Sequence, residues 1–533
     1  MGKRIYLDEW LKLKPYNKQV VTDAYYLQLS NKIKDILIKY HWNVLTKYFG
    51  IKIFNPLSCF IASYFEDIIS GTNIWTSFIE LHQKYYNKRL PYYDVGEYYE
   101  GEINEQDIRF LLWYFLNSIQ DDKFFNSNNP FIFNVSEDIF KILEQEYEYA
   151  PENNDLKKYY EIDENESNYY NVRKLLNNIF FGTYLFYPDT ILDLEKQQQQ
   201  IINDFKHKEL EPKILNEHKD TFIINNYTRL MSLPAKEWAS KIVGEGHPLS
   251  KELLQISRKI SGFFFYKGQD EKDIFLEHIA TGKRFAITKK SIDHPGDFSE
   301  IDSIFHIGIV RWKGEWWFSG IYYKKEFDAG LILDEKNSLK KRIPVFLIDA
   351  EREAIKKALQ SHFKAFLNFT GGKQIVFMPS KELEGFVKDF VKYFNNSLGL
   401  SKKEEEEAKK RTREKGLLGG ENKAFEDFKK ENEIALVFFN PEKGIEIAFF
   451  IHNAFPLPHN KYYNEKESNQ HVAKLLFDEG RSKELVNYCI DNCKKNLPFF
   501  NSTEGKLILE ELDFLLRFWK KNYYHTTPEM SIL

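Results

Sequence analysis

The stretch that decides the fold reads IFHIGIVRWKGEWWFSGIYY, at residues 304–323. Two runs rich in β-branched and aromatic residues flank Lys313-Gly314. The short glycine-containing link allows the chain to reverse, and the bulky side chains suit a pleated, half-buried surface, so the stretch predicts a β-hairpin. Because a hairpin this apolar is only marginally stable alone in water, it must pack against further strands or a covering layer.

Three more strands are predicted upstream of the hairpin, at residues 262–266, 273–279 and 284–287. Residues 280–282, which read ATG, suit a turn between the last two strands. Five short strands that follow one another closely are closed most compactly by a small, strongly bent sheet or a half-open barrel.

The flanks of this module have a different periodicity. Before it, apolar residues recur at helical spacing, as at Leu29, Ile33 and Ile36. The predicted fold class is therefore α+β and multidomain, with a mostly α-helical N-terminal region, a small five-stranded β-barrel-like module in the middle and a mixed α/β C-terminal region. The predicted domains are residues 1–233 (helical), 258–330 (barrel-like module), 331–400 (α/β segment) and 421–533 (β-hairpin plus helices).

Two further patterns shape the C-terminal region. Residues 343–348 are apolar enough to form a strand, and residues 434–439 and 445–451 read as a second hairpin. Residues 402–415 are nearly all charged, which is typical of a solvated helix held by Glu–Lys pairs and makes this stretch the best linker candidate.

Length, charge and cysteine content limit the class of protein. A chain of 533 residues is too long for one core, so three or four domains are expected. A net charge of -4 gives no global basic footprint for nucleic acid, although a local patch remains open. Three cysteines do not make a disulfide framework, which favours a reducing compartment.

Targeting signals are not predicted. The N-terminus, MGKRIYLDEW, has no apolar run after its basic residues and is not a secretory signal. No run of about 18 apolar residues is present, so no membrane span is predicted. These observations indicate a soluble, cytoplasmic protein with no membrane partner.

Five residues of the hairpin are the candidate binding residues: Arg311, Trp312, Trp316, Trp317 and Tyr322. Strand alternation places Trp316 and Tyr322 on one face and Trp317 on the other. Both faces are apolar, which indicates that the hairpin is covered on both sides. The rings are therefore either core aromatics, or a stacking platform for single-stranded nucleic acid or a groove for an aromatic or proline-rich peptide. Arg311 beside Trp312 fits the second interpretation.

The N-terminal region has five residues of metal-binding type near predicted helix ends: Glu66, Asp67, His82, Glu102 and Asp107. Helices can bring carboxylates and imidazoles into one metal site. The spacing lacks a Glu-x-x-His element, so helix capping and surface placement explain these residues better.

Cys489 and Cys493 stand one helical turn apart, with His471 nearby in sequence. Two thiolates at this spacing can hold zinc, but no second cysteine pair and no His-x-His arrangement accompany them. Two buried free thiols on an amphipathic helix are therefore the preferred interpretation.

Acidic residues and a lysine follow an apolar strand at Asp349, Glu351, Glu353 and Lys356. Carboxylates in such a place can hold Mg²⁺ in a nuclease. Their order and spacing fit the charged first turn of a helix better.

Motifs of the common catalytic classes are absent. The chain has no G-x-x-x-x-G-K-[ST], G-x-G-x-x-G, H-E-x-x-H or G-x-S-x-G motif and no kinase catalytic set. No catalytic residue, metal ligand or cofactor is predicted.

Several longer phrases resemble a known family: YLDEWLKLKPY and TDAYYLQLSN, SYFEDIISGTNIWTSFIELHQKYYNKRLPYYDV with EINEQDIRFLLW, IVRWKGEWWFSGIY, and LLRFWKKNYYHTTP. Together they resemble an uncharacterised bacterial family that is known only as a domain of unknown function. The resemblance extends over most of the chain, and it implies no activity, cofactor or catalytic residue.

Two functional hypotheses follow. The first is a non-catalytic binding or adaptor protein, whose central aromatic β-module recognises a peptide or a nucleic acid. It depends on the missing catalytic motifs and on a module type that often binds such ligands, which is an argument by fold analogy. The alternative is a divalent-metal-dependent hydrolase or nuclease that uses scattered carboxylates. The partner itself is unknown from sequence, a protein and a nucleic acid both being open.

Overall fold

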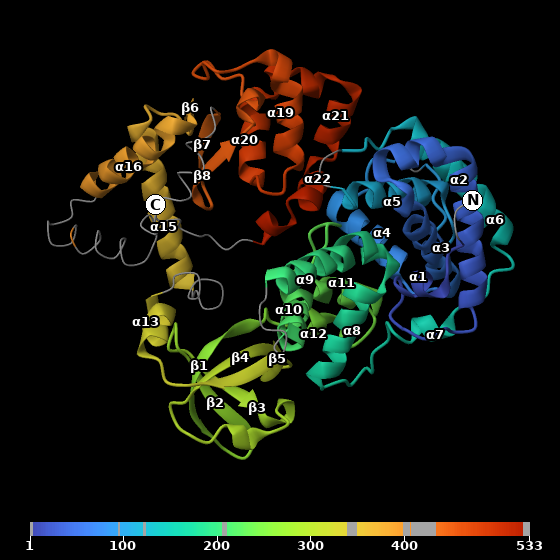
Figure 1. Ribbon diagram of the computed structural model, residues 1–533, viewed down its shortest axis with the longest axis horizontal. Coiled ribbons are helices and arrows are strands. Elements are labelled where there is room, and N and C mark those ends of the chain that lie inside the picture. The colour runs from blue at the N-terminus through green and yellow to red at the C-terminus, as the bar shows by residue number, and fades with distance from the viewer. Residues whose placement is uncertain are drawn as a thin grey trace. The chain divides into compact units, whose positions relative to one another are not determined.

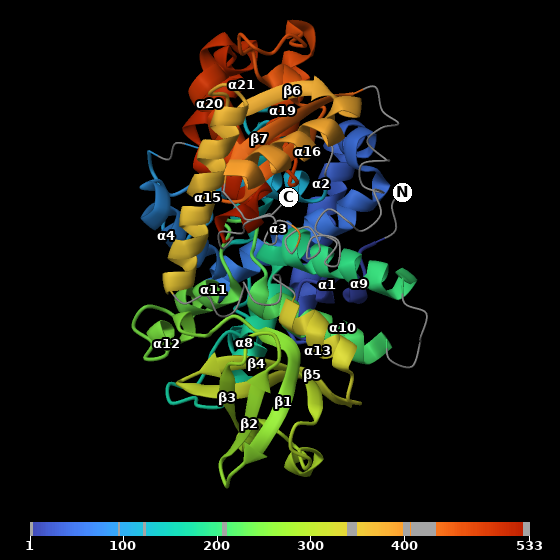
Figure 2. The same ribbon diagram turned by 90° about the vertical axis from the view of Figure 1, so that its left-hand side faces the viewer.

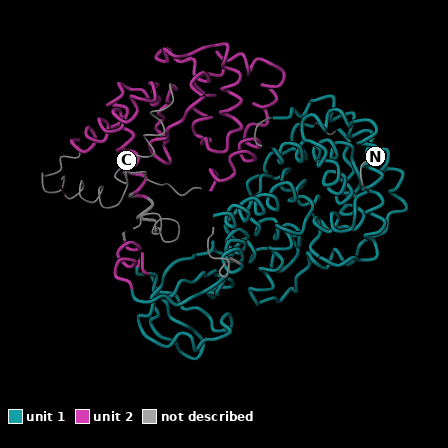
Figure 3. Tube along the Cα trace, viewed as in Figure 1, with its two compact units in different colours: residues 1–278, 282–327 teal, residues 279–281, 328–533 magenta. Residues whose placement is uncertain are grey.

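The computed structural model in Figure 1 describes residues 4–93, 96–120, 124–204, 211–337, 349–397, 406 and 433–525. The chain divides into two compact units, residues 1–278 with 282–327 and residues 279–281 with 328–533 (Figure 3). Within the described ranges, none of the helices is both long and apolar enough to cross a membrane.

The first unit begins with helices, as the sequence predicts. They are α1 (Leu7–Leu11), α2 (Asp23–Phe49), α3 (Phe54–Ser70), α4 (Ile74–Tyr86), α5 (Glu105–Ser118), α6 (Pro130–Glu146), α7 (Asn154–Lys157), α8 (Tyr169–Gly182), α9 (Leu192–Asp204), α10 (Glu211–Asn225), α11 (Ala235–Ile242) and α12 (Ser250–Leu254). The core lies around α3 and α5, which bury apolar residues on nearly every side. Phe60 and Phe115 pack there with ring centroids 5.0 Å apart. Gly71 ends α3 in the left-handed conformation, which glycine adopts without a steric penalty.

A closed five-stranded barrel follows the helices in the same unit, which confirms the predicted central module. Its strands are β1 (Ile260–Gln269), β2 (Asp273–His278), β3 (Arg284–Thr288), β4 (Ile304–Trp312) and β5 (Glu315–Lys325), in the order β1-β2-β3-β5-β4. Figure 2 shows them curling around one another. Neighbouring strands are antiparallel except β3 and β5, which are parallel and joined by the single pair Ile287–Trp316. The barrel is thus least tightly closed along the β3–β5 seam.

The register of the strands assigns side chains to the inside or the outside of the barrel. Cross-strand partners point to the same side of a sheet. Phe264 faces Phe305, and Ile309 faces Phe318, on the inner side. The fully buried Phe264 and Ile309 belong to the barrel core. Gly320, with a φ of 93°, allows the irregular pairing of β4 and β5 near Ile307.

The second unit is a mixed α/β arrangement. The antiparallel sheet β6-β7-β8 consists of β6 (Ile375–Pro379), β7 (Ile434–Asn440) and β8 (Gly444–Phe449). The helices of this unit are α13 (Ala329–Asn337), α15 (Asp349–Phe369), α16 (Ser380–Ser397), α19 (Glu465–Phe477), α20 (Lys483–Cys493), α21 (Thr503–Glu510) and α22 (Leu512–Trp519).

The central strand of this sheet is covered on both faces, which explains its continuous apolar sequence. Val437 and Phe439 of β7 pack into a core with Phe366 of α15 and Leu383 of α16. Phe438, on the opposite face, lies 5.4 Å from the ring of Tyr488 in α20. The second predicted hairpin is therefore present as β7 and β8. The strand predicted at residues 343–348 lies outside the described residues, as does the charged stretch 402–415 apart from Glu406.

Candidate functional site

Two of the predicted binding residues, Trp312 and Trp317, lie on the outer face of the barrel against the helical region. Both are almost fully buried, with 2% and 3% of their surface exposed. The indole N–H of Trp312 donates to the carbonyl of Ser167 at 3.1 Å. The ring of Trp317 packs against Tyr169 and Tyr170 of α8, with centroids 6.3 and 6.1 Å apart. These two tryptophans join the barrel to the helices, and in this structure their rings are not accessible to a ligand.

A buried ionic network reinforces the same joint. The Nζ atom of Lys259, just before β1, lies 2.6 Å from a carboxylate oxygen of Glu217 and 2.6 Å from one of Asp220, both on α10. Ser319 of β5 donates to Asp220 at 2.8 Å, and the backbone N–H of Ile321 donates to Glu217 at 2.9 Å. The side chains of Lys259 and Asp220 have no exposed surface. The network thus fixes β5 against α10, which lies next to the barrel in Figure 1.

This network was missed by the sequence analysis. Its members come from α10, from the residue before β1 and from β5, and no local spacing links them. A lysine that directly precedes a strand and acidic residues one turn apart on a helix are common surface patterns.

Trp316 and Tyr322 lie on the inner face of β5, beside the seam with β3, and both are half-buried. Trp316 packs edge-to-face on Phe285, with ring centroids 5.0 Å apart. Phe318, also half-buried, packs edge-to-face on Tyr322 at 5.4 Å. The buried Phe298, from the connection between β3 and β4, also packs on Tyr322, with ring centroids 5.5 Å apart. The three rings of β5 are therefore covered only in part. They form a partly exposed aromatic surface.

Two carboxylates lie beside this surface in the connection between β3 and β4. The Tyr322 hydroxyl donates to Asp297 at 2.8 Å. Burial, the hydrogen bond to Asp297 and the negative charges of Asp297 and Asp293 raise the pKa of Tyr322 to about 12. Asp293 and Asp297 are exposed, and within the described residues neither forms an ion pair. We call Trp316, Phe318, Tyr322, Asp293 and Asp297 the seam surface.

Arg311, the remaining predicted binding residue, is exposed at the end of β4. Its backbone N–H donates to Ser257 at 2.8 Å. Within the described residues its side chain takes part in no ion pair or stacking contact. Arg311 is the cross-strand partner of Trp316, so its side chain lies on the same side of the sheet as that ring.

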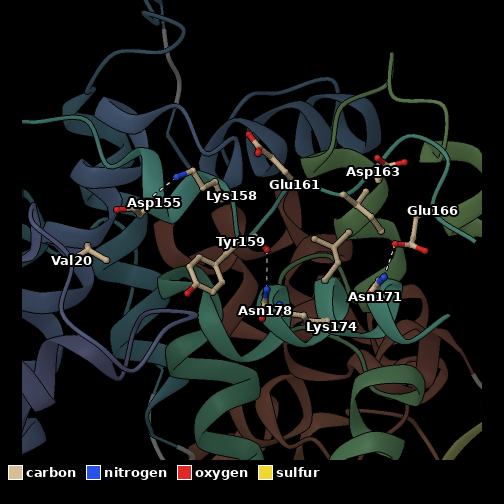
Figure 4. Close-up of a pocket in the computed structure, with 12 residues that line it drawn as sticks. Val20, Asp155, Lys158, Tyr159, Glu161, Asp163, Glu166, Asn171, Lys174 and Asn178 are labelled. Carbon is tan, nitrogen blue, oxygen red and sulfur yellow. Dashed lines mark hydrogen bonds and ion pairs between the residues drawn. The ribbon is translucent and has the colours of Figure 1, made fainter. Parts of the chain in front are cut away.

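A polar cavity of about 540 Å³ lies elsewhere in the first unit, next to α7 and α8 (Figure 4). Its charged lining consists of Asp155, Lys158, Glu161, Asp163, Glu166 and Lys174. Asp155 pairs with Lys158 at 3.0 Å, and Asn171 donates to Glu166 at 2.7 Å. Its four carboxylates outnumber its two lysines. Small-molecule sites are usually apolar with a few converging polar groups, which this cavity is not.

A second cavity, of about 720 Å³, lies next to α4 and the end of α11. Its walls also carry compensating charges. Lys241 pairs with Glu80 at 2.6 Å and with Glu245 at 2.8 Å, and Arg89 pairs with Glu100 at 2.9 Å. The charged residues that line this second cavity are thus balanced in number, three acidic and three basic.

The N-terminal acidic residues are not on the surface, so the prediction of surface placement is wrong for most of them. Glu66, Asp67, His82 and Asp107 are buried, and only Glu102 is exposed. Glu66 and Asp67 lie on α3 and Asp107 lies on α5, and these two helices are buried on nearly every side, so that even their polar positions face the interior. His82 lies on the buried face of α4.

Each buried group has its own local partners. Asp67 accepts from Tyr184 at 2.9 Å, and His82 lies 2.7 Å from the carbonyl of Lys88. Asp107 accepts from Tyr64 at 2.8 Å, and burial raises the pKa of Asp107 to about 7. Burial lowers the pKa of His82 to about 4. Across the described residues, no three such groups converge as metal ligands would.

The structure also describes the candidate metal-binding residues of the C-terminal region. Cys489 and Cys493 are free and buried on α20, which confirms the interpretation as buried thiols. Glu353 and Lys356 are exposed on α15, and the side chains of Asp349 and Glu351 lie outside the described residues.

The fold and the site describe a chain with a helical region, a barrel that carries a seam surface, and a separate α/β unit. Residues 4–260 match the model of the family described as "Protein of unknown function (DUF3843)". This confirms the resemblance to such a family, over a shorter range than the quoted phrases: the match ends at Ile260, where β1 begins. No curated protein and no solved structure matches the chain.

Proposed function

We propose that this chain is a non-catalytic binding or adaptor protein and that its barrel recognises an extended peptide through the seam surface. The observation that supports this is the cluster of half-buried rings of Trp316, Phe318 and Tyr322 on the strand where the barrel is least closed. Aromatic residues on a rigid scaffold supply large contact areas at a small cost in side-chain entropy.

The charges near the rings favour a peptide over a nucleic acid. Nucleic-acid affinity depends mainly on cations that neutralise phosphates. Two cations lie near Trp316: Arg311 is its cross-strand partner, and Lys290 is already paired with Glu315 at 2.9 Å. Beside Tyr322 lie the carboxylates of Asp293 and Asp297. A phosphate backbone would meet repulsion here, whereas a neutral or basic peptide would not.

A selection from a random peptide library tests the proposal. The full-length protein and its Tyr322→Ala variant serve as parallel targets, with Tyr149→Ala as the control, because Tyr149 is 76% exposed and lies in the helical region. We expect sequences that bind the wild type and the control but not Tyr322→Ala. If the selected peptides bind Tyr322→Ala equally well, or none are selected, the seam surface is not the binding site.

The alternative function, a divalent-metal-dependent hydrolase or nuclease, has a separate test. Metal analysis of the purified protein, followed by a nuclease assay with Mg²⁺ or Mn²⁺, would detect it. Turnover that scales with protein and is lost with a chelator would contradict the non-catalytic proposal.

We also infer a cytoplasmic location. The support is chemical: Cys59, Cys489 and Cys493 are all free and buried, which suits a reducing compartment. Fractionation of the native cells tests this, and recovery in an oxidising compartment would contradict it.

A further inference from the structure

The backbone of β5 beside the seam surface is already occupied, which limits how a peptide can bind. The N–H of Phe318 donates to the hydroxyl of Ser291 at 3.0 Å, and the carbonyl of Phe318 accepts from the hydroxyl of Tyr170 at 3.2 Å. The N–H of Ile321 donates to Glu217. Peptides that extend a sheet need such groups for main-chain hydrogen bonds. A ligand of the seam surface must therefore be held by side chains.

A polyproline II helix is the peptide conformation that fits this condition. It has no internal hydrogen bonds, it requires no ladder from its receptor, and it is already ordered before binding. Such helices dock on clusters of aromatic rings. The edge-to-face pairs Trp316–Phe285 and Phe318–Tyr322 hold the rings of the seam surface in fixed positions, at interplanar angles of 88° and 83°.

The charge beside the rings selects among proline-rich peptides. Asp297 is held by the Tyr322 hydroxyl at 2.8 Å, which positions its carboxylate at the edge of the aromatic cluster. Asp293 is exposed in the same connection, and the two carboxylates have no ion-pair partner within the described part of the chain. An arginine or lysine of the ligand would supply the missing positive charge, and arginine can do so with two hydrogen bonds.

From these contacts we infer that the seam surface binds a proline-rich segment of a partner protein that carries basic residues. Its prolines pack on Trp316, Phe318 and Tyr322, and its basic side chains pair with Asp293 and Asp297. This inference rests on the proposed function and adds the chemical class of the ligand.

Fluorescence anisotropy with the full-length protein and short labelled peptides tests the inference. The probes are repeats of Arg-Pro-Pro, Glu-Pro-Pro and Arg-Gly-Gly, together with a single-stranded oligothymidylate. We expect the Arg-Pro-Pro peptide to bind at least about tenfold more tightly than either other peptide, since each exchange removes one of the two recognition elements. Added salt should weaken the preference for arginine over glutamate.

Substitutions test which residues recognise the prolines of the peptide and which recognise its basic side chains. Tyr322→Ala should weaken binding of the Arg-Pro-Pro peptide by at least about tenfold, because it removes one of the three rings together with the hydroxyl that positions Asp297. Asp293→Asn with Asp297→Asn should remove the preference for arginine over glutamate while leaving the preference for proline over glycine. Glu271→Gln, an exposed carboxylate on the turn between β1 and β2, is the matched control and should change neither. Circular dichroism checks that every variant is folded.

The outcomes separate this inference from the proposed function. Equal affinity for Arg-Gly-Gly and Arg-Pro-Pro, with sensitivity to Tyr322→Ala, would overturn the proline assignment and leave peptide binding in place. Tighter binding of Glu-Pro-Pro would overturn the charge assignment. If no peptide binds, or if only oligothymidylate binds through Tyr322, both the inference and the proposed function are wrong.

Discussion

Replacing Lys259 with methionine should destabilise the first unit strongly, because Lys259 pairs with one carboxylate that has no exposed surface, Asp220, and one that is only 16% exposed, Glu217. Its Nζ lies 2.6 Å from Glu217 and 2.6 Å from Asp220, and its side chain has no exposed surface. Methionine keeps much of the aliphatic chain but leaves both carboxylates without the ammonium. Removing one partner of a buried ion pair typically costs about 3–5 kcal/mol of the free energy of unfolding.

Lys267→Met is the matched control. Lys267 forms an ion pair of the same length, 2.6 Å, with Asp302, but there the side chains are 26% and 63% exposed. Water screens this pair, and exposed pairs contribute about 0–1 kcal/mol. The two substitutions thus remove the same atoms from the same barrel at the same ionic distance and differ in burial.

Urea unfolding followed by tryptophan fluorescence measures the difference. Of the nine tryptophans all but Trp519 lie in residues 1–327, so the signal reports the first unit. We expect the midpoint of Lys259→Met to fall well below those of the wild type and Lys267→Met. A loss of about 1 kcal/mol or less for Lys259→Met, or equal losses for both variants, would refute the reasoning that burial makes this network decisive.

Three further substitutions probe other features. Gly320→Ala should destabilise the first unit by more than about 2 kcal/mol, because at its φ of 93° an added Cβ meets Glu217 and lies 2.5 Å from the Nζ of Lys259. Gly314→Ala is the control, because Gly314 has a φ of 85° and open space around it, so that only the smaller backbone cost applies. Similar losses of stability for both variants would contradict the predicted steric clash. Asp107→Asn should remove a pH dependence: burial raises the pKa of Asp107 to about 7 from an unfolded value of about 3.9, so the native state holds an extra proton and stability falls as pH rises between these values. The urea midpoint measured across that range should slope downward in the wild type and less so in the variant. Lys520→Met tests a pH dependence of stability of the opposite sign, because burial lowers the pKa of Lys520 to about 7 from an unfolded value of about 10.4. Above about pH 7 the stability of the second unit should therefore rise with pH in the wild type and not in the variant, as measured by calorimetry.

The barrel was predictable because its signals are local. Alternating β-branched and aromatic residues around a short glycine-containing link marked β4 and β5, and the predicted strands 262–266, 273–279 and 284–287 overlap β1, β2 and β3. The order of the strands was not predictable, since β1 pairs with β4 across a long connection and no local pattern records that pairing.

The buried charges were not predictable for a different reason. Carboxylates and lysines are rarely buried unless they are paired, so a single sequence assigns them to the surface. Asp67 and Asp107 are buried because tyrosines from other segments, Tyr184 and Tyr64, donate hydrogen bonds to them. Lys259 is buried because α10 supplies both of its partners. Such partners become visible only when the fold brings them together.

At the candidate site, too, the sequence does not show which side chains other segments cover, as two adjacent tryptophans illustrate. Trp316 and Trp317 are chemically identical, and alternation correctly predicts that they face opposite sides, but it cannot say which side is covered. Tyr169 and Tyr170, from far earlier in the chain, cover Trp317, whereas the single β3–β5 pair leaves Trp316 half-buried. The outer tryptophan therefore belongs to the joint between the barrel and the helices, and the inner one belongs to the surface that we propose binds a peptide. Substitution of Trp317 should thus lower stability, whereas substitution of Trp316 should weaken binding. These two adjacent residues therefore allow the fold of the barrel to be tested separately from its proposed function.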